Sequence, residues 1–252
     1  MSNEIRILQE ISILTWPPKM ILNLNGWKIR ISEGITKRAN SVSPLEYSGN
    51  NLIEDISVVE NYYRVNRLPS IFQLHDTFEP VSLQDKLLSL DYKIVDETIV
   101  MMANIDEINL PYQNEKYEFH LLENQLDKWL NDLQLINQTD KLQIDGRREI
   151  ISRIAQSNVG YFVARDNKKT VAVGLAVLQE NYMVIYSMFT HPDYRRKGIA
   201  QTILANMIEW GDVNLVDRVF LQVESENTSA INLYKKVGFK EKYRYRYLIK
   251  EL

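Results

Sequence analysis

One short segment combines the residue types that can bind a phosphate-bearing ligand. Over residues 188–200 an apolar strand ends at a proline-containing turn, three consecutive cations follow, and Gly198 opens an amphipathic helix. The first N–H groups of a helix have no intrahelical partners, and the helix dipole places partial positive charge beside them. Because Gly198 and Ala200 carry only small side chains, a bulky anion can reach these amides. The segment therefore predicts a phosphate-binding helix start, although an ordinary helix start with solvated basic residues has a similar pattern.

The rest of the sequence excludes several other kinds of site. It contains neither G-x-x-x-x-G-K-[ST] nor G-x-G-x-x-G, which counts against a P-loop nucleotidase and a Rossmann dehydrogenase. There are no cysteines, so disulfides, thiolate metal sites and a cysteine nucleophile are excluded. The three histidines, His75, His120 and His191, lack the spacing of metal ligands, and we expect no metal.

Two separated motifs resemble the GNAT superfamily of N-acetyltransferases. Residues 195–200, Arg-Arg-Lys-Gly-Ile-Ala, are similar to the acyl-CoA motif [QR]-x-x-G-x-[GA]. Residues 227–239 resemble a second motif, N-x-x-A-x-x-[LF]-Y-x-x-x-G-F. The resemblance covers roughly residues 117–252. It implies that two adjacent parallel strands splay apart, and that the thioester of acetyl-CoA, the cosubstrate, lies in the gap.

The resemblance also assigns roles to individual residues. Tyr234 would be the general acid that protonates the leaving thiolate, because a phenol with a pKa near ~10 is protonated at neutral pH. A tyrosine packed on the sheet is the alternative. Asn227 would lie near the pantetheine arm and can also be a helix N-cap. The general base is not assigned. Glu180 and Glu224 are candidates, each more typical of a surface carboxylate, and a water chain would also serve. The expected cofactor-binding residues are Met188, Phe189, Thr190, Arg195, Arg196, Lys197, Gly198, Ile199, Ala200 and Asn227.

Strands and helices alternate around these motifs, so we expect an α/β fold with a mixed sheet. In the second half the pattern predicts helices at 123–135, 145–156, 198–210 and 229–237, and strands at 159–165, 170–178, 182–190, 218–224 and 239–249.

The end of the first half resembles the end of the second at an offset of 147 residues. Residues 90–93 match 237–240, and a helix at 54–66 corresponds to one at 200–210. We favour tandem GNAT-like domains at 1–113 and 114–252, joined at the proline-containing stretch 109–114. The alternative is that any two helix–strand–helix–strand units look alike.

The first domain departs from the family pattern and is predicted to be degenerate. Tyr234 corresponds to Leu87, which cannot donate a proton, and the cationic triplet corresponds to the uncharged residues 48–51. Residues 26–30 and 36–42 resemble the leading domain of bacterial two-domain GNAT proteins. Within them Trp27 is most simply a core residue. Arg30 and Arg38 are candidates for holding an acceptor, but ordinary salt bridges are the favoured interpretation.

Charge and hydropathy limit the partners. The 252 residues contain 30 basic and 33 acidic side chains, a formal net charge of −3 without basic blocks, which disfavours nucleic-acid binding. No apolar run approaches the ~18 residues of a membrane span, and the N-terminus carries acidic residues where a signal peptide is basic. We therefore expect a cytoplasmic protein without a membrane partner.

The predicted reaction transfers an acetyl group from acetyl-CoA to a primary amine on a small molecule or peptide. The alternative is a non-catalytic acyl-CoA-binding sensor or interaction protein. The acceptor, the acyl chain length, the role of the first domain and the oligomeric state are left open by the sequence, and a homodimer is one candidate assembly.

Overall fold

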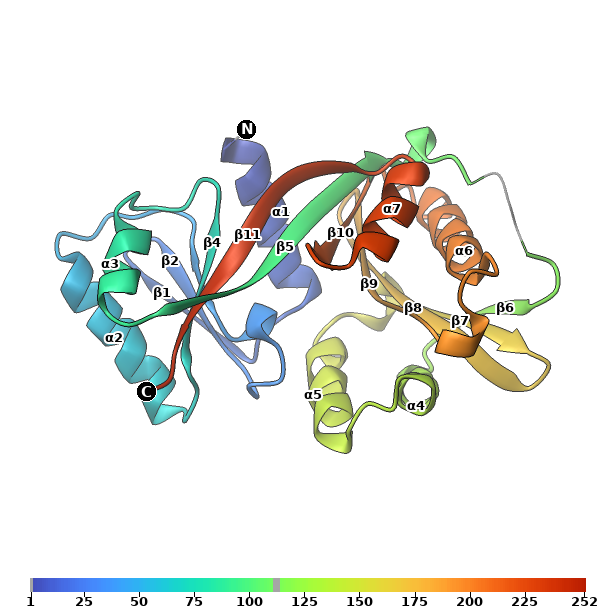
Figure 1. The fold of residues 1–252 in the computed structure, drawn as a ribbon, viewed down its shortest axis with the longest axis horizontal. Helices are drawn as coiled ribbons and strands as arrows, with labels where there is room; N and C mark the ends of the chain where they lie inside the picture. The colour runs from blue at the N-terminus through green and yellow to red at the C-terminus, as the bar shows by residue number, and fades with distance from the viewer. Residues whose placement is uncertain (1, 111–113) are drawn as a thin grey trace. The chain divides into compact units, whose positions relative to one another are not determined.

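The computed structural model describes residues 2–110 and 114–252, and its chain divides into two compact units (Figure 1). Unit 1 comprises Met1–Ile99 with Lys242–Leu252, and unit 2 comprises Val100–Glu241. Strands β5 (Lys93–Asn104) and β11 (Lys240–Lys250) each contribute residues to both units. Strand pairing is mixed in direction and helices accompany the strands in each unit, which confirms the predicted α/β class.

Unit 1 has an apolar core between one face of its sheet and the helices α2 (Leu52–Val65) and α3 (Leu83–Ser89). Its strands are β1 (Met20–Leu24), β2 (Trp27–Ile31), β3 (Val42–Pro44), β4 (Ser70–His75), residues 242–250 of β11 and residues 93–99 of β5. They follow the order β1-β2-β3-β4-β11-β5. Helix α1 (Ser2–Thr15) also belongs to unit 1. Phe72 and Leu74 of β4 belong to the core together with residues of α2 and α3. Gln73 and His75 alternate with them and therefore point to the opposite face.

Two predictions about the first half have different outcomes. Trp27 is fully buried in the core, as expected. The salt-bridge interpretation of Arg30 is wrong, because this buried guanidinium bonds Ser41 and Gln73, and no described carboxylate pairs with it. Burial lowers the pKa of Arg30, since desolvation penalises its charge. The hydrogen bonds that Arg30 donates to Ser41 and Gln73 offset part of the cost of burying this cation.

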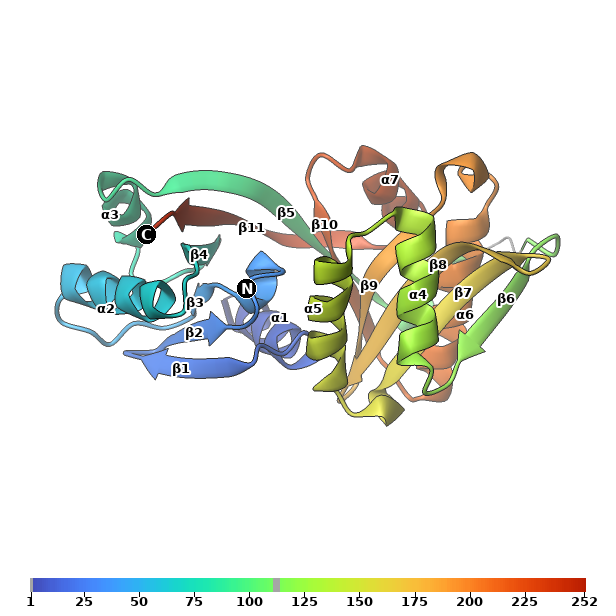
Figure 2. The same ribbon diagram turned by 90° about the horizontal axis from the view of Figure 1, so that it is seen from below.

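Unit 2 is a sheet with helices on both faces. Its strand order is β5-β10-β9-β8-β7-β6. Helices α4 and α5 lie on one face of β7–β9, and α6 lies on the other (Figure 2). Trp129 of α4 donates its indole N–H to the carbonyls of Phe162 and Gly174, at 3.3 and 3.1 Å. The strands are β6 (Glu118–Leu122), β7 (Val159–Asp166), β8 (Lys169–Gln179), β9 (Tyr182–Thr190) and β10 (Arg218–Glu224), and the helices are α4 (Leu126–Asn137), α5 (Lys141–Ser152), α6 (Ile199–Val213) and α7 (Thr228–Lys236).

The element order repeats, as the 147-residue offset predicted. The series α2-β4-α3-β5 in the first half has the same order as α6-β10-α7-β11 in the second. The unit boundary, however, differs from the expected division at 113/114. Residues 245–250 of β11 pair antiparallel with residues 75–70 of β4, so the last strand of the sequence completes the sheet of unit 1. Residues 111–113 of the expected joint lie outside the described residues.

Within the described ranges, no helix combines the length and apolar character that a bilayer-spanning helix requires.

Candidate active site

Strands β9 and β10 separate at their C-terminal ends. Their parallel register runs from Tyr182–Arg218 to Ile185–Leu221, and the described parts of both strands continue beyond it, to Thr190 and Glu224. Past Ile185, the edge of β9 that faces β10 is therefore available to a ligand. The splay that the sequence motifs implied is thus present in unit 2.

A β-bulge lies at the same point of β9. The register between β8 and β9 moves from Val173–Phe189 to Leu175–Tyr186, so two residues of β9 oppose Gly174 alone. Ser187, one of these two, has a positive φ of 50°. A bulge bends its strand and redirects its main-chain groups. Here the bulge comprises Ser187 and Met188, directly before Phe189 and Thr190.

The start of α6 leaves its amides uncovered. The chain makes a 3-10 turn over Pro192–Tyr194, and Arg196 and Gly198 then adopt positive φ values of 62° and 78°. Gly198 is the N-cap of α6, and no described side chain caps the helix or places an acidic group in its first turn. Successive amides in such a turn form a concave donor surface that suits an anion. The helix dipole increases this positive potential.

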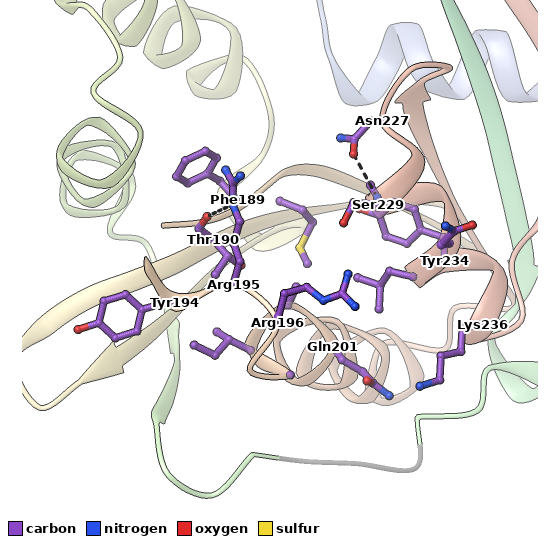
Figure 3. A pocket seen from close by; sticks show the side chains of 17 residues that line it. Phe189, Thr190, Tyr194, Arg195, Arg196, Gln201, Asn227, Ser229, Tyr234 and Lys236 are labelled. Atoms are coloured by element: carbon purple, nitrogen blue, oxygen red, sulfur yellow. Dashed lines mark hydrogen bonds between the residues drawn. The ribbon is translucent and has the colours of Figure 1, made fainter. Parts of the chain in front are cut away.

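The three consecutive cations point in different directions. The Nε of Arg195 donates to the carbonyl of Thr190 at 3.2 Å, and its guanidinium lies over the ring of Phe189 (Figure 3). The ammonium of Lys197 donates to the carbonyl of Asp193 at 2.9 Å and lies 4.9 Å from the Tyr194 ring centroid. Lys197 is therefore turned away from the cavity described next.

A cavity of about 750 Å³ connects the splayed strands with the start of α6. This volume suits a large ligand, because small-molecule sites usually measure about 300–1,000 Å³. All the predicted cofactor-binding residues except Lys197 line it, and so does Tyr234 (Figure 3). Sequence reasoning missed further residues that line the cavity: Gln201, Ser229, Asn232 and Lys236. They lie within one helical turn of the motif residues on α6 and α7, and this spacing could have indicated them.

Tyr234 is a buried phenol on the wall of this cavity. The residue is 6% exposed, and the centroids of its ring and the Phe239 ring are 5.7 Å apart. Its hydroxyl makes no hydrogen bond with any other described residue. Burial raises the pKa of Tyr234 to about 12, because the phenolate would lose its hydration. The group is therefore a proton donor over the whole physiological pH range.

Asn227 has the N-cap role that the sequence allowed. Its side-chain oxygen accepts a hydrogen bond from the amide of Ala230 at 3.1 Å, at the start of α7 (Figure 3). This bond satisfies one of the free donors of the helix. Asn227 also lines the cavity, so its amide nitrogen remains available to a ligand.

No carboxylate or imidazole belongs to the described lining of the cavity. Glu180 lies in the turn that precedes β9, at the end remote from the splay, and Glu224 ends β10 with an exposed side chain. Neither of these two candidate bases lines the cavity. The ionisable side chains that do so are Tyr194, Arg195, Arg196, Tyr234 and Lys236, which gives the wall a positive charge.

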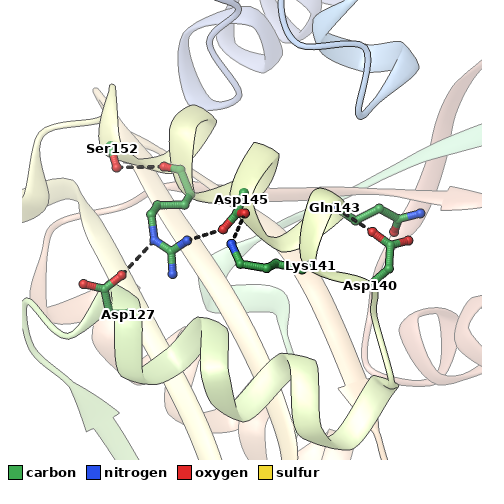
Figure 4. Close-up of polar contacts among 7 residues, drawn as sticks. Asp127, Asp140, Lys141, Gln143, Asp145 and Ser152 are labelled. Atoms are coloured by element: carbon green, nitrogen blue, oxygen red, sulfur yellow. Dashed lines mark hydrogen bonds and ion pairs between the residues drawn. The ribbon is translucent and has the colours of Figure 1, made fainter.

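A polar network joins α4 and α5, on the face of the unit 2 sheet opposite α6 (Figure 4). Arg148 of α5 bonds Asp127 of α4 and Asp145 of its own helix, both at 2.8 Å. Lys141 also bonds Asp145, and this contact lowers the pKa of that carboxyl. The network connects α4 and α5 through largely exposed groups. Among the described Asp, Glu and His residues, no group of three is arranged to hold a metal ion.

Comparisons with known proteins agree with this geometry. The family model described as "Probable histone acetyltransferase Rv0428c C-terminal" matches residues 2–248. The uncharacterized N-acetyltransferase YobR of Bacillus subtilis (strain 168) is 26% identical over 251 residues, which cover 98% of this chain and 99% of that protein.

Solved structures share the fold at low identity. A GCN5-related N-acetyltransferase from Kribbella flavida aligns with a TM-score of 0.76 and 10% identity, over 99% of this chain and 95% of that one. A tandem GNAT protein from the clavulanic acid biosynthesis pathway aligns with a TM-score of 0.69 and 9% identity, over 97% and 87% of the two chains. The chain therefore belongs to the Rv0428c C-terminal acetyltransferase family and is a GNAT-type N-acetyltransferase.

Proposed function

We propose that this acetyltransferase transfers an acetyl group from acetyl-CoA to a primary amine on a peptide or small-molecule acceptor. The main support is the continuity of one cavity from the uncapped start of α6 to the gap between β9 and β10. A diphosphate at one end and a thioester at the other match the two ends of this cavity. We also propose a cytoplasmic location, where acetyl-CoA is available.

Acetyl-CoA would supply an activated acyl group, and the chain would supply its binding and orientation. The amides of residues 196–200 would hold the diphosphate, with Arg195 and Arg196 adding charge. The main chain of Met188, Phe189 and Thr190 would bond the pantetheine arm along the free edge of β9, and Asn227 would bond it from α7. Lys197 would contribute through its main chain, since its ammonium is engaged by Asp193 and Tyr194. Such positioning can account for several kcal/mol of the barrier, about 7–11 in well-oriented cases.

Tyr234 would act as general acid toward the leaving thiolate. Its burial keeps the phenol protonated, and its place in the cavity wall makes it accessible to a ligand. Main-chain N–H groups on the splayed part of β9 would stabilise the developing oxyanion. Because no carboxylate lines the described cavity, we propose that water accepts the proton from the amine.

We further propose that unit 1 has lost cofactor binding. Leu87, which corresponds to Tyr234, is fully buried in the apolar core, and its side chain has no proton to donate. Catalysis would then depend on unit 2 alone.

The test measures CoA release with a panel of peptide N-termini, lysine peptides, polyamines and aminoglycosides. Tyr234→Phe should lower kcat by at least ~10-fold, toward the 10²–10⁴ range of general acid catalysis, and should leave the Kd for acetyl-CoA nearly unchanged. An undiminished kcat would exclude Tyr234 as the acid. Tight acetyl-CoA binding without turnover of any amine would favour the sensor alternative instead.

A further inference from the structure

Asn114 is a buried residue that bonds both sides of the α6 start. Its side-chain nitrogen donates to the carbonyl of Lys197 at 2.6 Å, and its main-chain N–H donates to the hydroxyl of Thr202 at 3.0 Å. Its side-chain oxygen accepts from the amide of Lys116 at 2.9 Å, which fixes the orientation of the carboxamide. Asn114 is 8% exposed and does not line the cavity. It lies in a stretch that the sequence pattern marked only as a linker.

These bonds fix two consecutive peptide groups. The carbonyl of Lys197 belongs to the same planar peptide as the N–H of Gly198. In a trans peptide the two groups point in opposite directions. The bond from Asn114 therefore directs the Gly198 N–H away from Asn114. A free peptide plane at this point could rotate, because Gly198 has access to much of backbone space.

The second peptide is fixed through Thr202. The Thr202 hydroxyl accepts from Asn114 and lies 3.3 Å from the carbonyl of Gly198, to which it donates. The amide of Thr202 bonds the same carbonyl at 3.0 Å. This carbonyl shares its peptide plane with the N–H of Ile199. Two neighbouring N–H groups of the helix start thus receive their direction from one asparagine and one threonine.

We propose that Asn114 is a positioning residue for the diphosphate of CoA: it orients the Gly198 amide directly and the Ile199 amide through Thr202. This inference rests on the proposed function, since it requires that these amides bind the diphosphate. Preorganised donors bind an anion more tightly than donors that must first be ordered. The contribution of Asn114 to binding affinity should therefore appear only with ligands that carry the diphosphate.

The experiment compares two ligands on the full chain, CoA and S-acetylpantetheine, of which only CoA has a diphosphate. Asn114→Ala should weaken CoA binding by about 10-fold, near the upper end of the net contribution of one neutral hydrogen bond such as the one from Asn114 to the Lys197 carbonyl. Binding of S-acetylpantetheine, measured by ligand-observed NMR titration, should change by less than about two-fold. Thr202→Val, which keeps the side-chain shape, should also weaken CoA binding selectively. Asn214→Ala is the matched control, because that amide bonds the Trp210 carbonyl at the opposite end of α6.

The outcomes separate this inference from the function on which it rests. Equal losses for both ligands, or an unchanged Kd for CoA in both variants, would overturn the positioning role while the wild-type protein still binds CoA. Failure of the wild-type protein to bind CoA would overturn the proposed function and the positioning role together. Selective loss for CoA in Asn114→Ala and Thr202→Val, with Asn214→Ala unaffected, would support the proposal.

Discussion

The charge at the start of α6 can be tested with one matched pair of substitutions. Gly198 has a φ of 78°, so most side chains there would cost about 1–2 kcal/mol of backbone strain. Asn and Asp tolerate this conformation better than other residues, and they have almost the same shape. Gly198→Asn and Gly198→Asp should therefore lose similar amounts of stability. Their difference in CoA affinity then measures charge alone.

The size of that difference follows from Coulomb's law. A carboxylate about 4 Å from a phosphate charge is repelled by about 1 kcal/mol in water and by about 4 kcal/mol near a protein surface. The diphosphate carries at least two such charges, and the cavity wall contains no described carboxylate that already repels it. We expect Gly198→Asp to bind CoA at least ~10-fold more weakly than Gly198→Asn, and up to several hundred-fold more weakly.

The assay is isothermal titration of both variants with CoA at low and at high salt, roughly 0.05 and 1 M. The Kd ratio should shrink at high salt, because the Debye length falls from about 14 to about 3 Å. Thermal unfolding checks that both variants fold equally well. If Asp and Asn at this position bind CoA equally at low salt, the diphosphate does not contact the start of α6, and the proposed site is wrong.

Two further predictions concern stability. Burial lowers the pKa of His75 from 6.5 to about 4, so the unfolded chain takes up a proton first as the pH falls. The unfolding free energy should therefore drop by about 3 kcal/mol from pH 6.5 to pH 4 relative to His75→Gln, measured by urea unfolding, and equal pH slopes would contradict this. Trp129→Phe leaves two buried carbonyls without their donor and should cost about 1–3 kcal/mol, whereas Arg148→Ala breaks only exposed ion pairs and should cost less than about 1 kcal/mol. Chemical denaturation of both variants tests this order, which the reverse ranking would refute.

The sequence predicts local elements well where clear boundary residues flank them. The strands at 182–190 and 218–224 have the predicted bounds. The helix expected at 145–156 begins earlier, as α5 at Lys141, because the side chain of Asp140 accepts from the amide of Gln143 at 2.8 Å and caps it. Strand β6 was not predicted, since its burial does not alternate and only one of its residues, Leu122, is buried. It forms by pairing with β7, about 40 residues later in the sequence.

Long-range pairing and side-chain direction are the features that the sequence could not predict. The pairing of β11 with β4 joins segments about 170 residues apart in the sequence, residues 245–250 and 70–75, and no local pattern specifies that partner. The motif placed Lys197 among the cations of the site, but the ring of Tyr194 and the carbonyl of Asp193 hold its ammonium elsewhere. Asn114 has no motif around it, and its contacts with the start of α6 arise only through folding.

The helix starts of α2 and α6, which correspond in the two halves, differ in the features that the proposed diphosphate site requires. At α2 the N-cap is Asn51, whose side-chain oxygen accepts from the amide of Glu54 at 3.3 Å. Glu54 and Asp55 add negative charge to the first turn, so an anion meets occupied donors and like charge there. At α6 the N-cap is Gly198, and its first turn has neither a capping side chain nor an acidic residue. Because the same order of helices and strands surrounds both helix starts, the fold alone does not determine which of them can accept an anion. The residues at and just after each N-cap determine it. For this reason the local sequence indicated a phosphate site in the second half and its loss in the first.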